Sequence, residues 1–207
     1  MKILDTSFET VKTTGLVAEL MAKHKIPGAT MAVVRGGEVV WSQAYGVRNE
    51  QGTPMHEGVL FECASLTKSL FALLAMQEVD MGKLDLDTPI APLLKEEPWS
   101  NDPRFLSITP RMCLCHSCGL PNWQAKPMEM LFDPGTRYSY SGEGYFLLQK
   151  LVEQIEGKNM NELFQERFFG KFGMESSTAY WTPAVYAAFS VGFAKDGSVR
   201  KVMVARP

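Results

Sequence analysis

The sequence predicts an α+β fold, in which an antiparallel hairpin near the N-terminus is packed by helices and followed by a mainly helical region. Two β-rich runs, residues 29–34 and 38–45, flank Gly36-Gly37, a dipeptide suited to the positive φ angles of a tight turn. After residue 64, most apolar residues recur at helical spacing. We expect three regions, which are a helix and hairpin over 1–50, a mainly helical part over 51–180, and extended segments over 181–207 that return toward the sheet.

The helices are expected from apolar spacing and from the residues at their ends. One amphipathic helix is predicted over about 7–24, before Pro27-Gly28. The helix that follows Ser65 is apolar around most of its circumference, which is typical of a buried helix, and Gly82 ends it. The other expected elements are a helix start with Thr109 as N-cap and Pro110 in first position, helices over 144–155 (closed by Gly157) and 159–169, and extended segments over 186–193 and 198–204 around the turn Asp196-Gly197.

Composition argues for a globular chain and against binding to nucleic acid or membranes. The 207 residues, 45% of them hydrophobic, can bury a sizeable core. The net charge is −2 with both signs scattered, which leaves no basic stripe for nucleic acid and no polybasic membrane patch. The N-terminus lacks the apolar stretch of a secretion signal, and no 18-residue apolar run occurs. We therefore expect a cytoplasmic protein.

The four cysteines are expected to be free thiols. Cys113, Cys115 and Cys118 cluster together, which does not suit a secreted disulfide framework. With His116 they also suggest zinc, because thiolate and imidazole are its preferred ligands. Structural zinc sites usually pair two separated ligand clusters, however, and no second cluster is present in the sequence. Small buried thiols are favoured, and zinc binding is kept as an alternative.

The most informative motif is Ser65-Leu66-Thr67-Lys68. Helical side chains three residues apart share one face, so the hydroxyl and the amine are expected side by side. At a helix N-terminus, Ser65 would have free backbone N–H groups to receive a developing oxyanion, and an uncharged Lys68 would accept the serine proton. The alternative is an N-capping serine with a solvated lysine. A second copy of the spacing, Ser198 to Lys201, follows a turn and is predicted as strand, so we attribute it to chance.

A second motif is the turn-rich loop from Pro134 to Tyr145, which runs directly into an apolar helix. The Ser65 motif and this loop combine with three further segments, Leu114-Cys115-His116-Ser117-Cys118-Gly119-Leu120-Pro121, Gly82-Lys83-Leu84-Asp85-Leu86-Asp87 and Gly173-Met174. Together they resemble the class C β-lactamase and penicillin-binding-protein family of serine hydrolases, which includes carboxylesterases and D-amino-acid peptidases. The resemblance covers most of the chain and implies a β-lactamase/transpeptidase-like fold.

The resemblance also implies roles for individual residues. Ser65 would be acylated, Lys68 would assist, and Tyr140, which matches the first residue of the family's Tyr-x-Asn motif, would act as general base or proton shuttle. Because the ordinary pKa of a phenol is about 10, a cation such as Lys68 would have to stabilise its charged form. The alternative for Tyr140 is a half-buried aromatic ring with a satisfied hydroxyl. His116 resembles the family's structural histidine rather than a catalytic base.

The chain departs from the family in two places. Gly142 stands where the family usually has Asn, which weakens the case for β-lactamase activity in particular. The family's third motif, Lys-Thr-Gly or His-x-Gly on an edge strand, has no match after Tyr140. We therefore expect an amino-terminal portion without its C-terminal sheet strands, whose exposed apolar face a missing C-terminal segment or a second chain would cover.

The predicted function is a serine hydrolase that acts through an acyl-enzyme on the ester, amide or β-lactam carbonyl of a small molecule, with a carboxylesterase favoured. Substrate contacts are expected from Gly142, Glu143 and Trp123, although such a loop charge is more often solvated and such a tryptophan is more often core or rim. No metal or organic cofactor is needed. The alternative is a catalytically impaired, penicillin-binding-like module, or a truncated fragment that needs a C-terminal partner.

Overall fold

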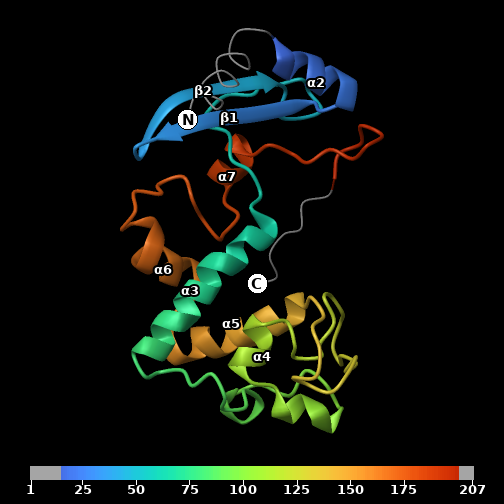
Figure 1. Ribbon diagram of the computed structural model, residues 1–207, viewed down its shortest axis with the longest axis vertical. Helices are drawn as coiled ribbons and strands as arrows, with labels where there is room; N and C mark the ends of the chain where they lie inside the picture. The colour runs from blue at the N-terminus through green and yellow to red at the C-terminus, as the bar shows by residue number, and fades with distance from the viewer. Residues whose placement is uncertain (1–14, 201–207) are drawn as a thin grey trace. The chain divides into compact units, whose positions relative to one another are not determined.

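The structure, a computed structural model, describes residues 15–200 (Figure 1). The chain forms two compact units, which separate between Glu62 and Cys63 and again between Ala179 and Tyr180. Residues 51–62 therefore belong with the hairpin rather than with the helical region. The reason is backbone pairing, because Met55 N–H donates to the carbonyl of Gly46 at 2.9 Å. Ser65, Lys68 and Tyr140 all lie in the unit of residues 63–179.

The first unit contains the predicted hairpin. Strands β1 (Gly28–Arg35) and β2 (Glu38–Gly46) pair antiparallel, with Gly36 and Gly37 at φ of 58° and 85° in the turn. This confirms the hairpin. Helix α2 (Leu16–His24) precedes it, and the earlier part of the predicted helix lies outside the described residues. No residue of either strand is buried, and the exposed apolar side chains of the hairpin are Met31, Val34, Val39 and Val40.

The return segment of this unit contains a helix where an extended segment was predicted. Helix α7 (Pro183–Ala188) begins after Thr182, whose hydroxyl accepts the Val185 N–H at 3.2 Å. The prediction is wrong for residues 186–188, because this capped start, with proline in the first turn, outweighs the β-rich composition, whereas Phe189 and Phe193 form isolated β-bridges. Beyond the helix, Ser190 N–H donates to the carbonyl of Leu60 at 2.8 Å. The predicted Asp196-Gly197 turn is present, next to an antiparallel bridge between Phe193 and Val199.

The second unit is mainly helical. A 3₁₀ turn, Ala64–Leu66, leads into α3 (Thr67–Asp80), and two short 3₁₀ segments follow, Ala91–Leu93 and Pro103–Ser107. The predicted caps of the next two helices are confirmed. Thr109 caps α4 (Pro110–Leu114), and α5 (Gly142–Glu156) is closed by Gly157 in the left-handed conformation. Helix α6 (Met160–Phe164) continues into a π-helical turn, Gln165–Phe169. Both α3 and α4 contact α5.

The core of this unit lies among α3, α5, α6 and the π-helical turn. Among its fully buried side chains are Leu74, Leu147, Leu151, Leu163 and Phe168. The prediction of a buried helix after Ser65 is wrong for one face of α3, because the other elements of the unit pack against the opposite face, where Phe71, Leu74 and Ala75 are buried. Leu66 just before the helix and Leu73 within it are 73% and 49% exposed. Within residues 15–200, none of the helices combines the length and the apolar character that a membrane crossing requires.

Candidate active site

Ser65, Lys68 and Tyr140 meet at one point. The Tyr140 hydroxyl donates a hydrogen bond to Ser65 Oγ at 2.7 Å, although the two residues are 75 positions apart in the sequence. Lys68 Nζ donates to the same oxygen at 3.3 Å. One serine oxygen is therefore in hydrogen-bonding reach of both an amine and a phenol, which is the geometry that an activated serine nucleophile requires.

The backbone before Ser65 is held in a costly conformation. Ala64 has φ of 43°, in the left-handed region that costs a residue with a side chain about 1–2 kcal/mol. Ser65 thus lies in the 3₁₀ turn before α3, rather than in its first α-helical turn, and Lys68 is the second residue of α3. Such strain persists where the surrounding structure imposes it, often at active sites. Here it precedes an exposed serine.

Tyr140 is held by hydrogen bonds to its two neighbours in the chain. The Ser139 N–H donates to the backbone carbonyl of His116 at 2.8 Å, and the Ser141 N–H donates to His116 Nδ1 at 3.1 Å. Ser141 is also the N-cap of α5, because its hydroxyl accepts the Gly144 N–H at 2.8 Å. The buried start of α5 therefore fixes the position of the exposed phenol.

The charge of Lys68 distinguishes two neighbouring phenols. Its Nζ lies 5.2 Å from the ring centroid of Tyr140 and 5.5 Å from that of Tyr145. Desolvation raises the pKa of Tyr140, but its hydrogen bonds to Ser65 and Lys68 and the charge of Lys68 outweigh this, so the pKa falls below 10.0. Burial, followed by the charge of Tyr140, raises the pKa of Tyr145. Tyr140 is therefore the phenol suited to act as a base.

Gly142 lies in tight contact with the loop before Gln124. Its N–H donates to Asn122 Oδ1 at 3.0 Å. A Cβ atom at this position would lie 2.6 Å from the carbonyl oxygen of Asn122 and 2.8 Å from Cη2 of Trp123, so a side chain cannot fit without movement. The Trp123 indole packs edge-on against Phe146 and is 44% exposed. The space beside Gly142 thus holds an aromatic ring with a solvent-facing surface.

Glu143 does not have either of its expected environments. Its side chain is only 1% exposed, and its carboxylate accepts the Gln124 N–H at 3.0 Å. The solvated alternative is wrong, and this burial leaves almost no surface for the predicted substrate contact. Glu143 is buried because its carboxylate, in the first turn of α5, is stabilised by the helix dipole and binds the backbone of a separate loop at Gln124.

The sequence did not single out Tyr145 as a neighbour of Tyr140, and it indicated only a structural role for His116. The His116 ring lies between two tyrosines, with centroids 4.3 Å from Tyr140 and 5.0 Å from Tyr145. Tyr145 also donates its hydroxyl to the carbonyl of Leu114 at 3.3 Å. The available signal was the close repetition of tyrosine at 138, 140 and 145 within one motif.

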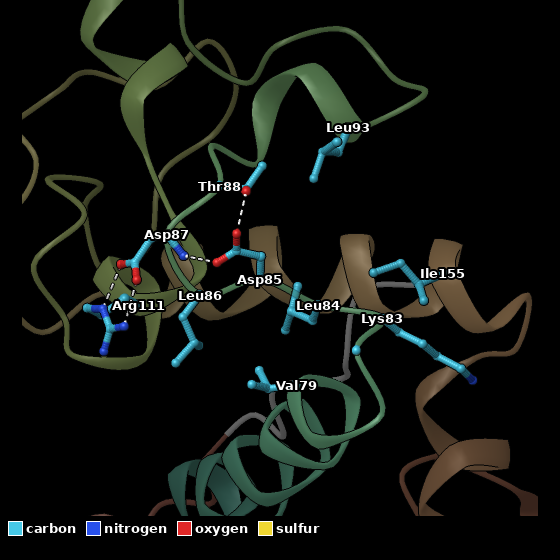
Figure 2. A pocket seen from close by; sticks show the side chains of 11 residues that line it. Val79, Lys83, Leu84, Asp85, Leu86, Asp87, Thr88, Leu93, Arg111 and Ile155 are labelled. Carbon is cyan, nitrogen blue, oxygen red and sulfur yellow. Dashed lines mark hydrogen bonds and ion pairs between the residues drawn. The ribbon is translucent and has the colours of Figure 1, made fainter.

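A separate pocket, of about 550 Å³, lies beside the segment that follows α3 (Figure 2). The polar groups on one side of it bind one another. Arg111 donates two hydrogen bonds of 2.7 Å to Asp87, and Asp85 accepts the Asp87 N–H and the Thr88 hydroxyl. This pocket lacks the serine, lysine and tyrosine described above, so we place the candidate site at Ser65. Within the described part of the chain, His, Cys, Asp and Glu side chains form no group of three or more that could hold a metal.

Comparison with known proteins gives the family and a measure of length. The chain is 32% identical over 183 residues to a probable fimbrial assembly protein FimD of Dichelobacter nodosus, which covers 77% of this chain and 46% of that protein. It is 30% identical over 132 residues to esterase EstB of Burkholderia gladioli, covering 63% of this chain and 34% of the esterase. The chain thus spans about half the length of these relatives, or less.

Solved structures share the fold. A D-alanine carboxypeptidase AmpC from Burkholderia cenocepacia superposes with a TM-score of 0.78 at 25% identity, over 95% of this chain and 58% of that one. A class C β-lactamase gives 0.79 at 24% identity, over 96% and 58%. These matches confirm the expected β-lactamase/transpeptidase-like fold. Residues 13–204 match the model of the Beta-lactamase family, so the chain belongs to the β-lactamase family.

Proposed function

We propose that this protein is a serine hydrolase that cleaves small carboxylic esters through an acyl-enzyme on Ser65. The observation that carries the proposal is the pair of hydrogen bonds on Ser65 Oγ, 2.7 Å from the Tyr140 hydroxyl and 3.3 Å from Lys68 Nζ. Similarity to an esterase supports the choice of reaction.

The proposed acylation step uses Tyr140 as the base. Ionised Tyr140 removes the proton from Ser65 Oγ, which attacks the carbonyl carbon of the ester. The bond from that carbon to the alcohol oxygen breaks, and the departing alkoxide takes the proton from Tyr140. The products are acyl-Ser65 and a free alcohol. The positive charge of Lys68 lowers the cost of the phenolate throughout.

Deacylation repeats the sequence with water. Tyr140 takes a proton from a water molecule, the resulting hydroxide attacks the acyl carbon, and the bond to Ser65 Oγ breaks. Ser65 recovers its proton from Tyr140, and the carboxylic acid leaves. Because Ser65 and Tyr140 are both exposed, water can reach the acyl group without rearrangement of the protein.

The surroundings of Tyr140 favour esters over β-lactams. Gly142 offers no side-chain amide to a substrate, and the adjacent Trp123 presents an apolar surface. A hydrocarbon acyl group can bury area on such a ring, whereas an amide-bearing acyl group would lose hydrogen bonds to water there. The alternative is a catalytically impaired, penicillin-binding-like module, or a truncated fragment that needs a C-terminal partner; the chain spans 46% of one relative and 58% of one solved structure.

The test combines labelling with turnover. Wild type and Ser65→Ala are incubated with a fluorophosphonate probe, and hydrolysis of p-nitrophenyl acetate and of a chromogenic cephalosporin is recorded. Ser69→Ala is the matched control, because Ser69 is an exposed serine only four residues further on, in α3. We expect wild type and Ser69→Ala to be labelled and to hydrolyse the ester faster than the cephalosporin, and Ser65→Ala to do neither. Absence of label on the wild type would instead support the catalytically impaired module.

A further inference from the structure

His116 forms hydrogen bonds with the backbone on both sides of Tyr140. Its backbone carbonyl accepts the N–H of Ser139 and its Nδ1 accepts the N–H of Ser141, at 2.8 and 3.1 Å. Its ring also lies against the Tyr140 ring at a centroid distance of 4.3 Å and an interplanar angle of 34°. A single residue thus fixes the backbone before Tyr140, the backbone after it, and one face of the phenol.

The backbone conformation of His116 is unusual and allows these contacts. Its φ is 56°, in the left-handed region, which histidine adopts more readily than most residues with a side chain. Its N–H donates to the carbonyl of Cys113 at 3.2 Å, which anchors the residue to the end of α4. The left-handed turn lets the carbonyl and the ring of one residue both reach the loop of residues 139–141.

The hydrogen bond between Ser141 and His116 depends on the protonation state of the imidazole. Nδ1 can accept the Ser141 N–H only when it carries no proton, so the neutral ring has its proton on Nε2. A second proton, on Nδ1, would set two N–H groups against each other. The titratable groups facing the ring are Lys68 on α3, Tyr145 on α5, and Tyr138 and Tyr140 on the loop. Of these groups only Tyr140 becomes negative in the proposed reaction, and the positive charge of Lys68 lies beside it.

We propose that His116 is a positioning residue that holds Tyr140 against Ser65 as a neutral imidazole, and that its protonation releases Tyr140 and lowers activity in acid. The proposal rests on the hydrolase function proposed for Ser65 and Tyr140. It assigns His116 no contact with substrate and no proton transfer in the reaction.

The electrostatic setting agrees with this arrangement. Desolvation, followed by the charge of Lys68, lowers the pKa of His116 below 6.5. A histidine whose pKa is lowered by folding is neutral in the folded protein above that pKa and charges as the pH falls through it. The hydrogen bond from the Ser141 N–H to Nδ1 is therefore complete at neutral pH and is lost only below pH 6.5.

Two substitutions separate the hydrogen bond to Ser141 from the ring contact with Tyr140. Asparagine tolerates left-handed backbone, and its Oδ1 stands near the place of Nδ1 and cannot be protonated. His116→Asn should therefore keep most activity at pH 8 and lose the part of the decline in kcat/KM that sets in below pH 6.5, whereas the decline caused by protonation of Tyr140 itself should remain. His116→Phe keeps a ring but has no acceptor for Ser141, and we expect a loss of about 100-fold in kcat/KM at all pH values. His56→Asn, at an exposed histidine of the other unit, is the control and should leave the profile unchanged.

Nitrogen NMR of the wild-type imidazoles tests the inference without any measurement of activity. At pH 7 we expect His116 to show an unprotonated Nδ1 and a protonated Nε2, and to titrate at lower pH than the control histidine. A proton on Nδ1 at pH 7, or an acid decline that persists unchanged in His116→Asn, would overturn the proposal. Absence of Ser65 labelling would sink the hydrolase function instead, and the NMR result would still decide how His116 is protonated.

Discussion

Helices α3 and α5 approach each other at two sites with polar groups, and the two sites differ in access to solvent. Near their first residues, Ser65, Lys68 and Tyr140 meet, and Tyr140 is 37% exposed. Near their last residues, Glu78 and Glu156 meet, and Glu78 is 0% exposed. We call these the open end and the closed end of the helix pair. A perturbed pKa occurs at both, so it does not by itself identify the functional one.

The closed end balances two carboxylates with two cations. Arg167 lies 3.5 Å from Glu78 and 3.7 Å from Glu156, and Lys83 contacts both carboxylates. Burial, followed by the proximity of Glu156, raises the pKa of Glu78, whereas the hydrogen bond from Lys83 lowers that of Glu156. Here polar groups secure helix ends. At the open end one cation serves two hydroxyl groups that a substrate can reach, which allows chemistry.

The largest effect is expected at the open end. Tyr140→Phe removes the group that moves the serine proton and keeps the ring that packs on His116. We expect kcat/KM for p-nitrophenyl acetate to fall by about 100-fold to 10,000-fold, the usual range for general acid–base groups, with an unchanged melting temperature. Tyr138→Phe, at a phenol that is 68% exposed, is the control. Equal rates in the two variants would deny Tyr140 a chemical role.

A large effect on stability is expected at the closed end. Arg167→Met leaves the buried Glu78 with Lys83, at 3.9 Å, as its remaining cation. Breaking a buried ion pair in this way costs about 3 kcal/mol, which urea denaturation at pH 7 would measure. The rate of Ser65 labelling should not change at temperatures where the variant is folded. A labelling defect in the folded variant would mean that the two ends are not independent.

A smaller, pH-dependent effect is expected for Glu78→Gln. A carboxyl whose pKa is raised by folding stabilises the protein below its unfolded pKa of 4.5 and loses that contribution as the pH rises through its folded pKa. The amide mimics the protonated form. Relative to wild type, the variant should therefore gain unfolding free energy as the pH rises from 4 to 8. A difference that stays constant over this range would contradict the raised pKa.

The smallest effect is expected from the strained residue beside the nucleophile. Ala64→Gly removes the cost of the left-handed backbone but adds freedom to the unfolded chain, so the net gain in stability should be below about 1 kcal/mol. Ala64→Val should instead be destabilising, because a branched side chain fits this conformation poorly. Thermal melts of both variants and of wild type would show whether the melting temperature decreases in the order glycine, alanine, valine at position 64.

Local features of the sequence were predictable and contacts between distant segments were not. The hairpin turn at Gly36-Gly37, the Thr109 cap and the Ser65–Lys68 spacing each depend on a few adjacent residues. The role expected of Tyr140 came from family resemblance, because no local rule places a residue 75 positions away beside Ser65. The burial of Glu143 was missed for the same reason, since its partner, the backbone of Gln124, lies in another loop.

The account depends most on a covalent bond between Ser65 and the acyl group of an ester. Brief incubation with p-nitrophenyl acetate, followed by acid quenching, proteolysis and mass spectrometry of the peptides, tests this directly. We predict an acetyl group on the peptide that contains Ser65, and its absence in Ser65→Ala. Acetyl groups found only on lysines, or equally in the variant, would contradict the account.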